Sequence, residues 1–351
     1  MRFRSDSVHE MEGIAVEPVT AWFEANVDGV TPPLEFSLIS GGRSNLTFRV
    51  GDQAGNTWVL RRPPLGQILA TAHDMGREFR IISALGPTPV PVPAAIGYCD
   101  DESVNDKPFY VMGLVEGTIV RDVETARTAL GPAQRRAAGE SLVDVLADIH
   151  AVDIDAVGLG DLARRDGYID RQLRRWHAQF EQSKSRDVPL VDSVHERLAK
   201  LVPDQGPAAI VHGDYRLDNT MLDTDGHVNA VLDWELCTLG DPLADVGLLM
   251  VYWSEKRDEG ASALLGAPTT VDGFSTRAEL RARYAERSGR DVEHLDFYIA
   301  FGYWKLACIL EGVYSRYVAG VMGSDRAVVQ GMDNQVAYLA ERADQALDAM
   351  P

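Results

Sequence analysis

The spacing of hydrophobic positions changes character about a third of the way along the chain. Residues 34–60 contain three short apolar runs separated by turns at residues 40–45 and 51–56, which are rich in residues that tolerate positive φ. This pattern predicts a small antiparallel sheet. Helices are expected at residues 18–26 and 71–85, and in the second of these Met75, Phe79, Ile82 and Leu85 share one buried face.

The rest of the chain has a helical pattern. Prolines at positions 87, 89, 91 and 93 predict an extended link, because proline cannot donate a backbone hydrogen bond, and residues 109–115 form an apolar strand. Helices are expected at residues 133–150, 169–181, 191–201, 276–288, 294–319 and 326–347. A strand-rich start followed by helices predicts an α+β protein with two lobes, formed by residues 1–115 and residues 116–351.

Composition and charge narrow the function classes. Hydrophobic residues make up 45% of the 351 residues and charged residues 25%, which is typical of a globular protein. The formal charge of −19 disfavours binding to nucleic acid or to anionic membranes. The three cysteines, Cys99, Cys237 and Cys308, are too far apart to predict a disulfide framework or a metal site.

The expected location is the cytoplasm. Residues 1–17 contain no apolar block that would serve as a signal peptide, and the most apolar stretches are short or interrupted by Lys305, so no membrane partner is expected. The sequence leaves the oligomeric state open.

The candidate catalytic and metal-binding residues lie between residues 211 and 235. Residues 223–226, Asp-Thr-Asp-Gly, form a turn between two short apolar runs and predict a hairpin. Counted outward from this turn, Asn219 and Asp233 arrive opposite each other to within about a residue. Two oxygen ligands held together in this way suit a hard cation, so Asn219 and Asp233 are the predicted Mg²⁺ ligands, with phosphates completing the shell.

Two further residues of the same loop fit phosphoryl transfer. Asp214, five residues before Asn219, is placed to accept the proton of an attacking hydroxyl. Arg216 is placed to neutralise charge on the phosphoryl group in flight. His212 is interpreted as a hydrogen-bonding residue that holds the loop. The combination carries the argument, because isolated Asp and Asn residues usually form caps and turns.

The combination resembles a known family. His212-Gly213-Asp214, Asn219 and Asp233-Trp234-Glu235 are similar to the signature of the aminoglycoside phosphotransferase and choline kinase family, relatives of the protein kinases. Within that family, residues 38–45 and 72–78 are most similar to the kinase-like domains associated with acyl-CoA dehydrogenases and to their free-standing bacterial relatives. The resemblance implies a two-lobed protein-kinase-like fold, ATP and Mg²⁺ as cofactors, and transfer of the γ-phosphate to a hydroxyl of a small molecule.

The resemblance also assigns the nucleotide site. Backbone N–H groups of the turn can hold phosphates, and the turn consists of Gly41, Gly42, Arg43, Ser44 and Asn45. Val59 and Arg61 share a strand face, where Val59 would cover the adenine and Arg61 would reach the phosphates. The backbone that would meet the adenine edge belongs to Met112, Gly113, Leu114 and Val115.

One position departs from the family pattern. Related kinases generally have Lys where this chain has Arg61, and Arg is not interchangeable with Lys. Either Arg61 fulfils the role, with Glu78 as its partner, or Arg62 or a residue elsewhere does. His150 is interpreted as a core residue, and Asp245 as a tie between the catalytic loop and the helix that follows.

Three alternatives stay open at the level of sequence. A pseudokinase that binds nucleotide without turnover would explain the missing Lys, but Asp214, Asn219 and Asp233 are all retained. An oxidoreductase is disfavoured because no Gly-x-Gly-x-x-Gly follows a first strand. An aminoglycoside-type antibiotic phosphotransferase differs from the favoured reading only in its acceptor.

The acceptor is expected to contact the helices at residues 169–181 and 294–319. Cations and aromatic residues outnumber carboxylates there: Arg171, Arg174, Arg175, Trp176, Tyr303, Trp304, Lys305, Tyr314, Arg316 and Tyr317. This balance favours an anionic or amphipathic hydroxylated acceptor, such as a hydroxyacyl thioester, over a polycationic antibiotic. The alternative is that the arginines line a solvated helix face.

Overall fold

The computed structural model describes residues 11–40, 45–65, 74–258, 267–320 and 326–350. The chain divides into two compact units, which are described separately. The first comprises Met1–Glu116 together with Leu232–Glu235, and the second comprises Gly117–Val231 and Leu236–Pro351. The short segment Leu232–Glu235, which follows the predicted hairpin, therefore belongs to the first unit. A division of the chain at one residue cannot include such a segment.

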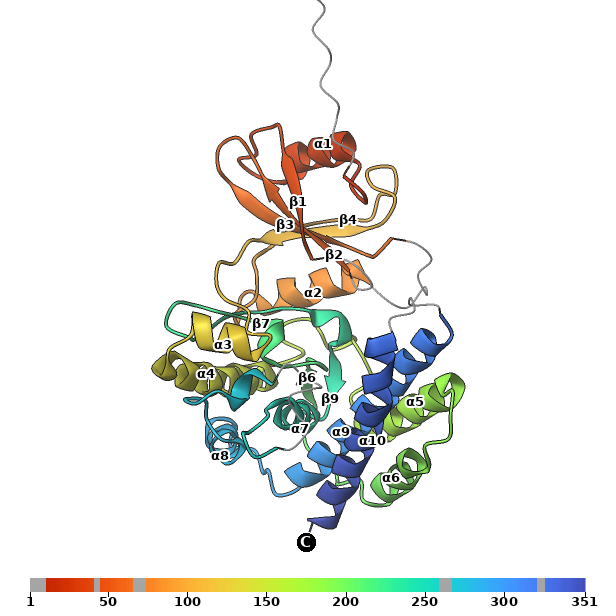
Figure 1. Ribbon diagram of the computed structural model, residues 1–351. Helices are drawn as coiled ribbons and strands as arrows, with labels where there is room; N and C mark the ends of the chain where they lie inside the picture. The colour runs from red at the N-terminus through yellow and green to blue at the C-terminus, as the bar shows by residue number, and fades with distance from the viewer. Residues whose placement is uncertain (1–10, 41–44, 66–73, 259–266, 321–325, 351) are drawn as a thin grey trace, which may run out of the picture. The chain divides into compact units, whose positions relative to one another are not determined.

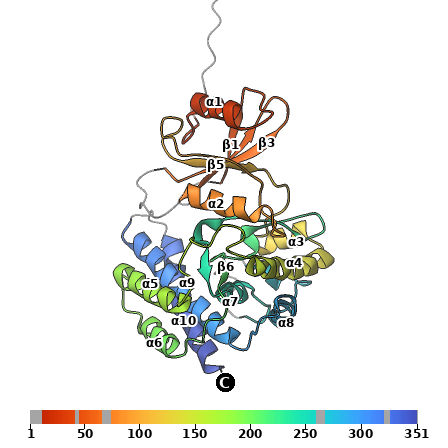
Figure 2. The ribbon, with the colours of Figure 1, turned by 180° about the vertical axis from the view of Figure 1, so that it is seen from behind.

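The first unit is built on a five-stranded antiparallel sheet with strand order β1-β2-β3-β5-β4. Its strands are β1 (Glu35–Ser40), β2 (Leu46–Gly51), β3 (Thr57–Arg62), β4 (Ala95–Cys99) and β5 (Phe109–Gly113), and its helices are α1 (Val16–Asn26) and α2 (Met75–Leu85). The two helices lie on opposite sides of this sheet (Figures 1 and 2). Strand β4 was not predicted from the sequence, in which no helix or strand was assigned between the prolines at positions 87–93 and the strand that begins at residue 109.

Strand alternation decides what each helix contacts. Phe23 of α1 packs in one hydrophobic cluster with Phe48, Leu60 and Val111, which lie at alternate positions of β2, β3 and β5. The intervening residues point to the opposite face, because successive side chains of a strand alternate. On that opposite face the hydroxyl of Tyr110 donates to a carboxylate oxygen of Glu78 on α2, at 3.0 Å. The sheet thus has an apolar face toward α1 and a polar, buried patch toward α2.

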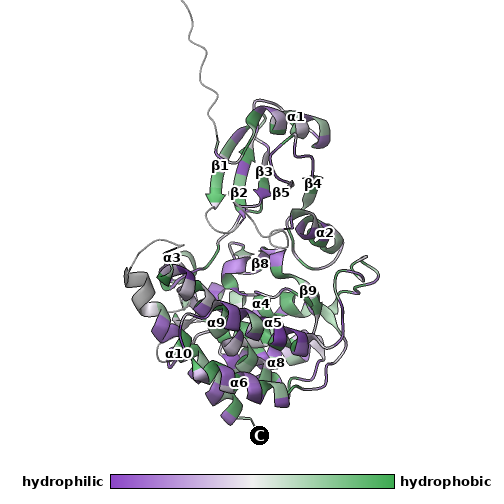
Figure 3. Cartoon of the chain, turned by 90° about the vertical axis from the view of Figure 1, so that its right-hand side faces the viewer, coloured by the Kyte–Doolittle hydropathy of each residue, from purple (hydrophilic) through white to green (hydrophobic). Residues whose placement is uncertain are grey.

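The second unit is mainly helical. Its helices are α3 (Val123–Ala129), α4 (Pro132–Ala151), α5 (Tyr168–Ser183), α6 (Pro189–Lys200), α7 (Leu243–Tyr252), α8 (Arg277–Ser288), α9 (Leu295–Val318) and α10 (Arg326–Asp348). Two short antiparallel ladders accompany them: β6 (Ala209–Val211) with β9 (Thr238–Gly240), and β7 (Thr220–Leu222) with β8 (Val228–Val231). Outer helices such as α6 carry hydrophilic and hydrophobic residues side by side (Figure 3).

Helix α9 lies at the centre of the second unit, where it packs against α5, α6, α7 and α10. A helix was expected next to Asp245, but the sequence did not set the bounds of α7, because this helix is apolar almost all round and shows no one-sided stripe. Gly247 lets it approach α9 closely, since a Cβ there would lie 2.5 Å from the backbone of Tyr298. Among the described residues, no helix has the length and apolarity needed to cross a bilayer. The three cysteines are buried, and none of them forms a disulfide.

Candidate active site

The loop after β6 is held in place by the buried carboxylate of Asp245. The backbone N–H groups of His212 and Gly213 donate to Asp245 of α7, at 2.6 and 2.8 Å. Gly213 has φ of 86°, and a Cβ there would lie 2.8 Å from the carbonyl oxygen of Leu236, so only glycine fits without displacement. The predicted tie through Asp245 is present, and it fixes the backbone immediately before Asp214.

A buried network supports Asp245 in turn. The Nε2 of His150 lies 3.5 Å from Asp245, and its Nδ1 lies 2.8 Å from the hydroxyl of Tyr284. Burial lowers the pKa of His150 and outweighs the nearby carboxylates. Burial alone would raise the pKa of Asp245, but hydrogen bonds from His150 and from the loop hold it below its ordinary value. A neutral imidazole therefore donates to an ionised carboxylate, as expected for a core role of His150.

Asp214 is surrounded by groups that fix its carboxylate. The side-chain amide of Asn219 donates to its Oδ2 at 2.9 Å and to its backbone oxygen at 2.8 Å. The guanidinium of Arg216 lies 3.4 Å from Oδ2 and pairs with Asp218 at 3.0 Å. Asp214 itself is partly open to solvent. The structure therefore brings two of the predicted residues, Asn219 and Arg216, to the accessible carboxylate of a third, Asp214.

Tyr252 completes this cluster, although no local pattern in the sequence marks it as a site residue. The guanidinium carbon of Arg216 lies over the Tyr252 ring, 4.7 Å from the ring centre. Burial, and then the charge and hydrogen bond of Asp214, raise the pKa of the Tyr252 hydroxyl far above its ordinary range. The phenol of Tyr252 therefore stays neutral and donates a hydrogen bond to the Asp214 carboxylate.

Lys305 holds the loop from the side of α9. Its Nζ donates to the backbone carbonyl oxygen of Gly213 at 3.0 Å and lies 5.6 Å from the ring centre of Trp176. The side chain is buried, and burial lowers the pKa of the ammonium, although Asp214 and Asp245 oppose this shift. Lys305 was expected among the acceptor residues, whereas in the structure it supports the loop that carries Asp214.

The predicted hairpin is present. Thr220 pairs with Val231 across β7 and β8, so Asn219 precedes this rung by one residue and Asp233 follows it by two. Asp233 has φ of 64°, a left-handed conformation that is uncommon outside glycine. Because Asn219 belongs to the second unit and Asp233 to the first, their joint binding of a metal stays a prediction.

Within the first unit, Arg61 and Arg62 point to opposite faces of β3. The Nε of Arg61 lies 3.1 Å from Glu78, and its NH2 is ion-paired with Asp233. Burial opposes the charge of Arg61, but the carboxylates, Glu78 first, raise its pKa. Arg62 is fully buried, where its guanidinium donates to the backbone oxygen of Gly13 and to Asp106. The position of Arg61 thus supports the first of the two alternatives, and Arg62 is committed to the packing around α1.

Glu78 is more deeply placed than a helix-surface residue. It is 1% exposed, and it accepts hydrogen bonds from Tyr110 at 3.0 Å and from the amide of Asn45 at 2.9 Å. Burial raises the pKa of Glu78 and outweighs Arg61. The expected stripe of α2 is correct at Met75, Ile82 and Leu85, but Glu78 and Ile81 are buried with it. Phe79 is half-buried, stacked on Tyr98 at 5.9 Å.

Of the other residues predicted for the nucleotide site, Val59, Met112 and Gly113 lie on the same sheet. Val59 is buried and pairs across the ladder with Met112. Gly113 ends β5, with its N–H donating to the carbonyl of Ala94 at 2.8 Å, and Leu114 and Val115 follow as partly exposed residues. Gly41, Gly42, Arg43 and Ser44 lie outside the described residues.

The residues expected to contact the acceptor, on α5 and α9, differ in how exposed they are. The two cations Arg174 and Arg175 of α5 are exposed, and Arg175 lies over the ring of Trp176 at 5.2 Å. Arg171 instead donates to backbone oxygens of the preceding loop. Trp304 of α9 is fully buried. Only part of the predicted cationic and aromatic set is therefore available to a ligand.

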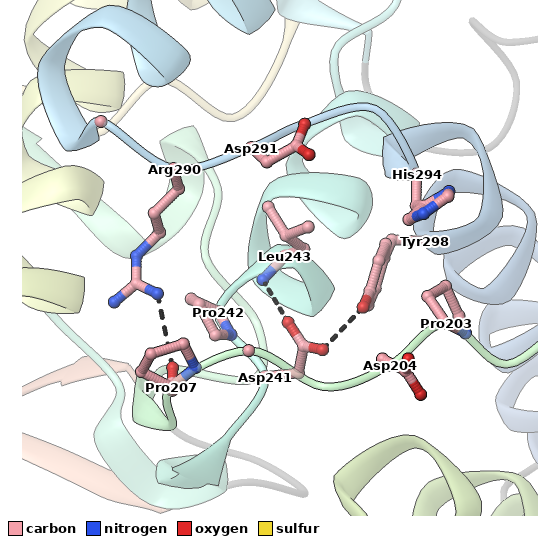
Figure 4. A pocket seen from close by; sticks show the side chains of 12 residues that line it. Pro203, Asp204, Pro207, Asp241, Pro242, Leu243, Arg290, Asp291, His294 and Tyr298 are labelled. Carbon is pink, nitrogen blue, oxygen red and sulfur yellow. Dashed lines mark hydrogen bonds between the residues drawn. The ribbon is translucent and has the colours of Figure 1, made fainter.

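A hollow of about 400 Å³ lies in the second unit (Figure 4). At its floor the carboxylate of Asp241 accepts from the hydroxyl of Tyr298 at 2.6 Å and from the N–H of Leu243 at 3.1 Å. Arg290 donates to the backbone oxygen of Pro207 at 3.4 Å. Asp241 and Arg290 are thus engaged in hydrogen bonds that join α7, α9 and the adjoining loops.

Comparisons with known proteins agree with this arrangement. The profile of the phosphotransferase enzyme family matches residues 35–298. Over 88% of its length the chain is 34% identical to acyl-CoA dehydrogenase family member 10 of Mus musculus, of which the match covers 29%. The chain spans between 29% and 39% of the length of such relatives, which include family member 11 of Homo sapiens.

Solved structures are similar over nearly the whole chain. A crystal structure of a Ralstonia eutropha protein, provisionally called an aminoglycoside phosphotransferase, shares 33% identity with a TM-score of 0.80, covering 95% of this chain and 98% of that one. An aminoglycoside phosphotransferase in complex with AMP-PNP and hygromycin B has a TM-score of 0.58 at 16% identity, over 90% of this chain and 93% of that one, and is similar in fold alone.

Proposed function

Because this chain belongs to the phosphotransferase enzyme family and is a small-molecule kinase, we propose that it transfers the γ-phosphate of ATP to a hydroxyl group of a small molecule, with Asp214 as the catalytic carboxylate. The observation that supports this most is the cluster of Asn219, Arg216 and Tyr252 around the accessible carboxylate of Asp214. Such a carboxylate accepts the proton of the attacking hydroxyl and aligns its oxygen.

The residues present fit a hard cation. Both hydrogen bonds of the Asn219 side chain to Asp214 are donated by its amide nitrogen, which leaves its carbonyl oxygen as the atom to offer to a metal. Asp233 adds a carboxylate held in an uncommon backbone conformation. Oxygen donors of this kind suit Mg²⁺, which would neutralise charge on the phosphates when bound.

The first unit supplies groups suited to a nucleotide. Arg61 carries a buried guanidinium whose positive charge is secured by Glu78, and in the family this position generally carries Lys. We assign Arg61 to the phosphates, Val59 and Met112 to the adenine, and the turn that ends at Asn45 to the backbone contacts.

For the acceptor we favour an anionic or amphipathic hydroxylated compound, of which a hydroxyacyl thioester is one. Of the two exposed arginines of α5, Arg174 and Arg175, Arg175 supports this choice. It lies over the ring of Trp176, which is also contacted by Lys305, the residue that donates to the Gly213 carbonyl. The relatives named as acyl-CoA dehydrogenase family members also favour an acyl thioester. An aminoglycoside acceptor would require carboxylates where these arginines lie.

The test is ADP release by the purified chain with Mg²⁺ and ATP, against hydroxyacyl-CoAs, choline-like alcohols and kanamycin-type aminoglycosides. The proposal expects saturable turnover with a hydroxyacyl-CoA and none with the antibiotics. Turnover of the antibiotics alone would refute the acceptor assignment, and the absence of ATP binding would refute the kinase assignment.

A further inference from the structure

A group of metal-ligating side chains lies on α5 and α6, on residues that the proposed reaction does not use. His177 and Glu181 are one turn apart on α5, and Asp192 lies on the first turns of α6. One nitrogen of His177 and one oxygen from each carboxylate all lie within 4.8 Å of one another. We propose that these three residues bind a first-row transition metal ion, of which Zn²⁺ is the best fit.

The imidazole of His177 is held in place by its surroundings. Its ring is stacked on that of His195, with centroids 4.0 Å apart and planes inclined by 2°, and His195 in turn lies 5.5 Å from Trp304. The Nε2 of His177 lies 2.9 Å from Asp192. Because its ring plane is already fixed, the imidazole loses little conformational freedom when it binds a metal. Contacts around metal-bound histidines commonly fix the ring in this way.

The chemistry of the donor set chooses the class of metal. One imidazole nitrogen and two carboxylate oxygens suit Zn²⁺ and its neighbours, whereas Mg²⁺ and Ca²⁺ prefer oxygen alone. Tetrahedral Zn²⁺ with bonds of about 2.0–2.2 Å requires ligand atoms roughly 3.3–3.5 Å apart, so His177 and Asp192 must separate by about half an ångström, and water takes the fourth position. All three side chains are partly exposed, which leaves a path for the ion.

An internal cation already occupies this cluster. The Nζ of Lys184 is ion-paired with Glu181 and lies 3.9 Å from Asp192. Its presence shows that the two carboxylates attract positive charge, and Asp187 and Glu196 add to the negative potential around the group. Because exposed ion pairs of this kind contribute little free energy, a divalent ion can displace the ammonium. Lys184 is therefore expected to weaken metal binding by competition.

The experiment measures Zn²⁺ binding by calorimetry on tag-free protein in excess Mg²⁺, with the absorbance of bound Co²⁺ as a second signal. We expect one ion per chain with a micromolar Kd, weakened at least about tenfold in His177→Ala and in Asp192→Ala. Lys184→Met should bind about tenfold more tightly than the wild type, because the competing ammonium is gone. His227→Ala is the matched control, since His227 is also beside an aspartate, Asp223, at 3.9 Å, but on an exposed turn.

The gain of affinity in Lys184→Met keeps the test independent of folding defects. Tighter binding there, with loss in His177→Ala and no change in His227→Ala, supports the site. A wild-type Kd for Zn²⁺ weaker than about 100 micromolar would overturn the proposal, because such binding is too weak for a specific protein site. Binding that is unaffected by His177→Ala, or not strengthened by Lys184→Met, would overturn it as well.

Discussion

Lys305→Met tests whether α9 positions the catalytic loop. The substitution removes the ammonium that lies 3.0 Å from the Gly213 carbonyl oxygen, and it keeps a long apolar side chain in a buried position. A buried carbonyl that loses its donor costs about 1–3 kcal/mol. Removing the buried ammonium has the opposite effect, because the folded state no longer bears all of the desolvation cost of the charge, which is several kcal/mol. The free energy of unfolding should therefore change by less than about 2 kcal/mol.

The effect on catalysis should be larger than the effect on stability. Gly213 immediately precedes Asp214, and a misplacement of about 1 Å in a catalytic group can cost roughly a hundredfold in rate. We expect kcat to fall about tenfold or more, with KM for ATP nearly unchanged, because Lys305 lies in the second unit and Arg61 in the first.

Steady-state kinetics and urea unfolding of the same preparations measure both quantities. Lys200→Met is the control, since it makes the same chemical change on an exposed residue at the end of α6 and should leave rate and stability at wild-type values. A Lys305→Met enzyme with wild-type kcat and intact stability would refute the positioning role.

Three further predictions concern Arg61, Asp233 and His150. Arg61→Ala should raise KM for ATP or lower kcat, whereas Arg62→Ala should lower stability by about 1–3 kcal/mol through unpaired backbone acceptors, with kinetics unchanged in the folded fraction; the reverse pattern would transfer the role to Arg62. Asp233→Ala should weaken Mg·ATP much more than metal-free ATP in calorimetry, and equal losses would contradict its role as a metal ligand. Because burial lowers the pKa of His150 from 6.5, the unfolded chain binds the proton first, and stability should fall by up to about 1.4 kcal/mol per pH unit below pH 6.5. His150→Gln should lose this slope in unfolding curves measured from pH 7.5 to 5.5, and an unchanged slope would refute it.

Local patterns were sufficient for most of the fold. The strands around the two polar turns, the hairpin and the long amphipathic helices follow from the period of apolar residues, and the protein-kinase-like α+β fold and the family implied by residues 212–235 are confirmed. Strand β4 and the bounds of helix α7 were missed for opposite reasons. The strand follows four prolines, and the helix is buried on all sides, so neither shows the one-sided pattern on which sequence reasoning depends.

The candidate site was predictable where its residues are adjacent in sequence. Asp214 and Asn219 share one loop, and the hydrogen bond between them follows from that proximity. Tyr252 and Lys305 reach the same loop from α7 and α9. Their contacts depend on how helices pack, and tertiary packing leaves no local signal in the chain. The burial of Glu78 has the same origin, because it requires Asn45, Arg61 and Tyr110 to converge on one side of the sheet.

The most direct test of the central claim is the Asp214→Asn variant, which removes the proton acceptor while preserving size and much of the hydrogen bonding. Titration with ATP and Mg²⁺ should give a wild-type Kd, while phosphate transfer to the accepted hydroxyl compound should fall by about a hundredfold or more, as for the loss of a general base. An Asp214→Asn enzyme that transfers phosphate at a near wild-type rate would contradict the assignment of Asp214 as the catalytic carboxylate.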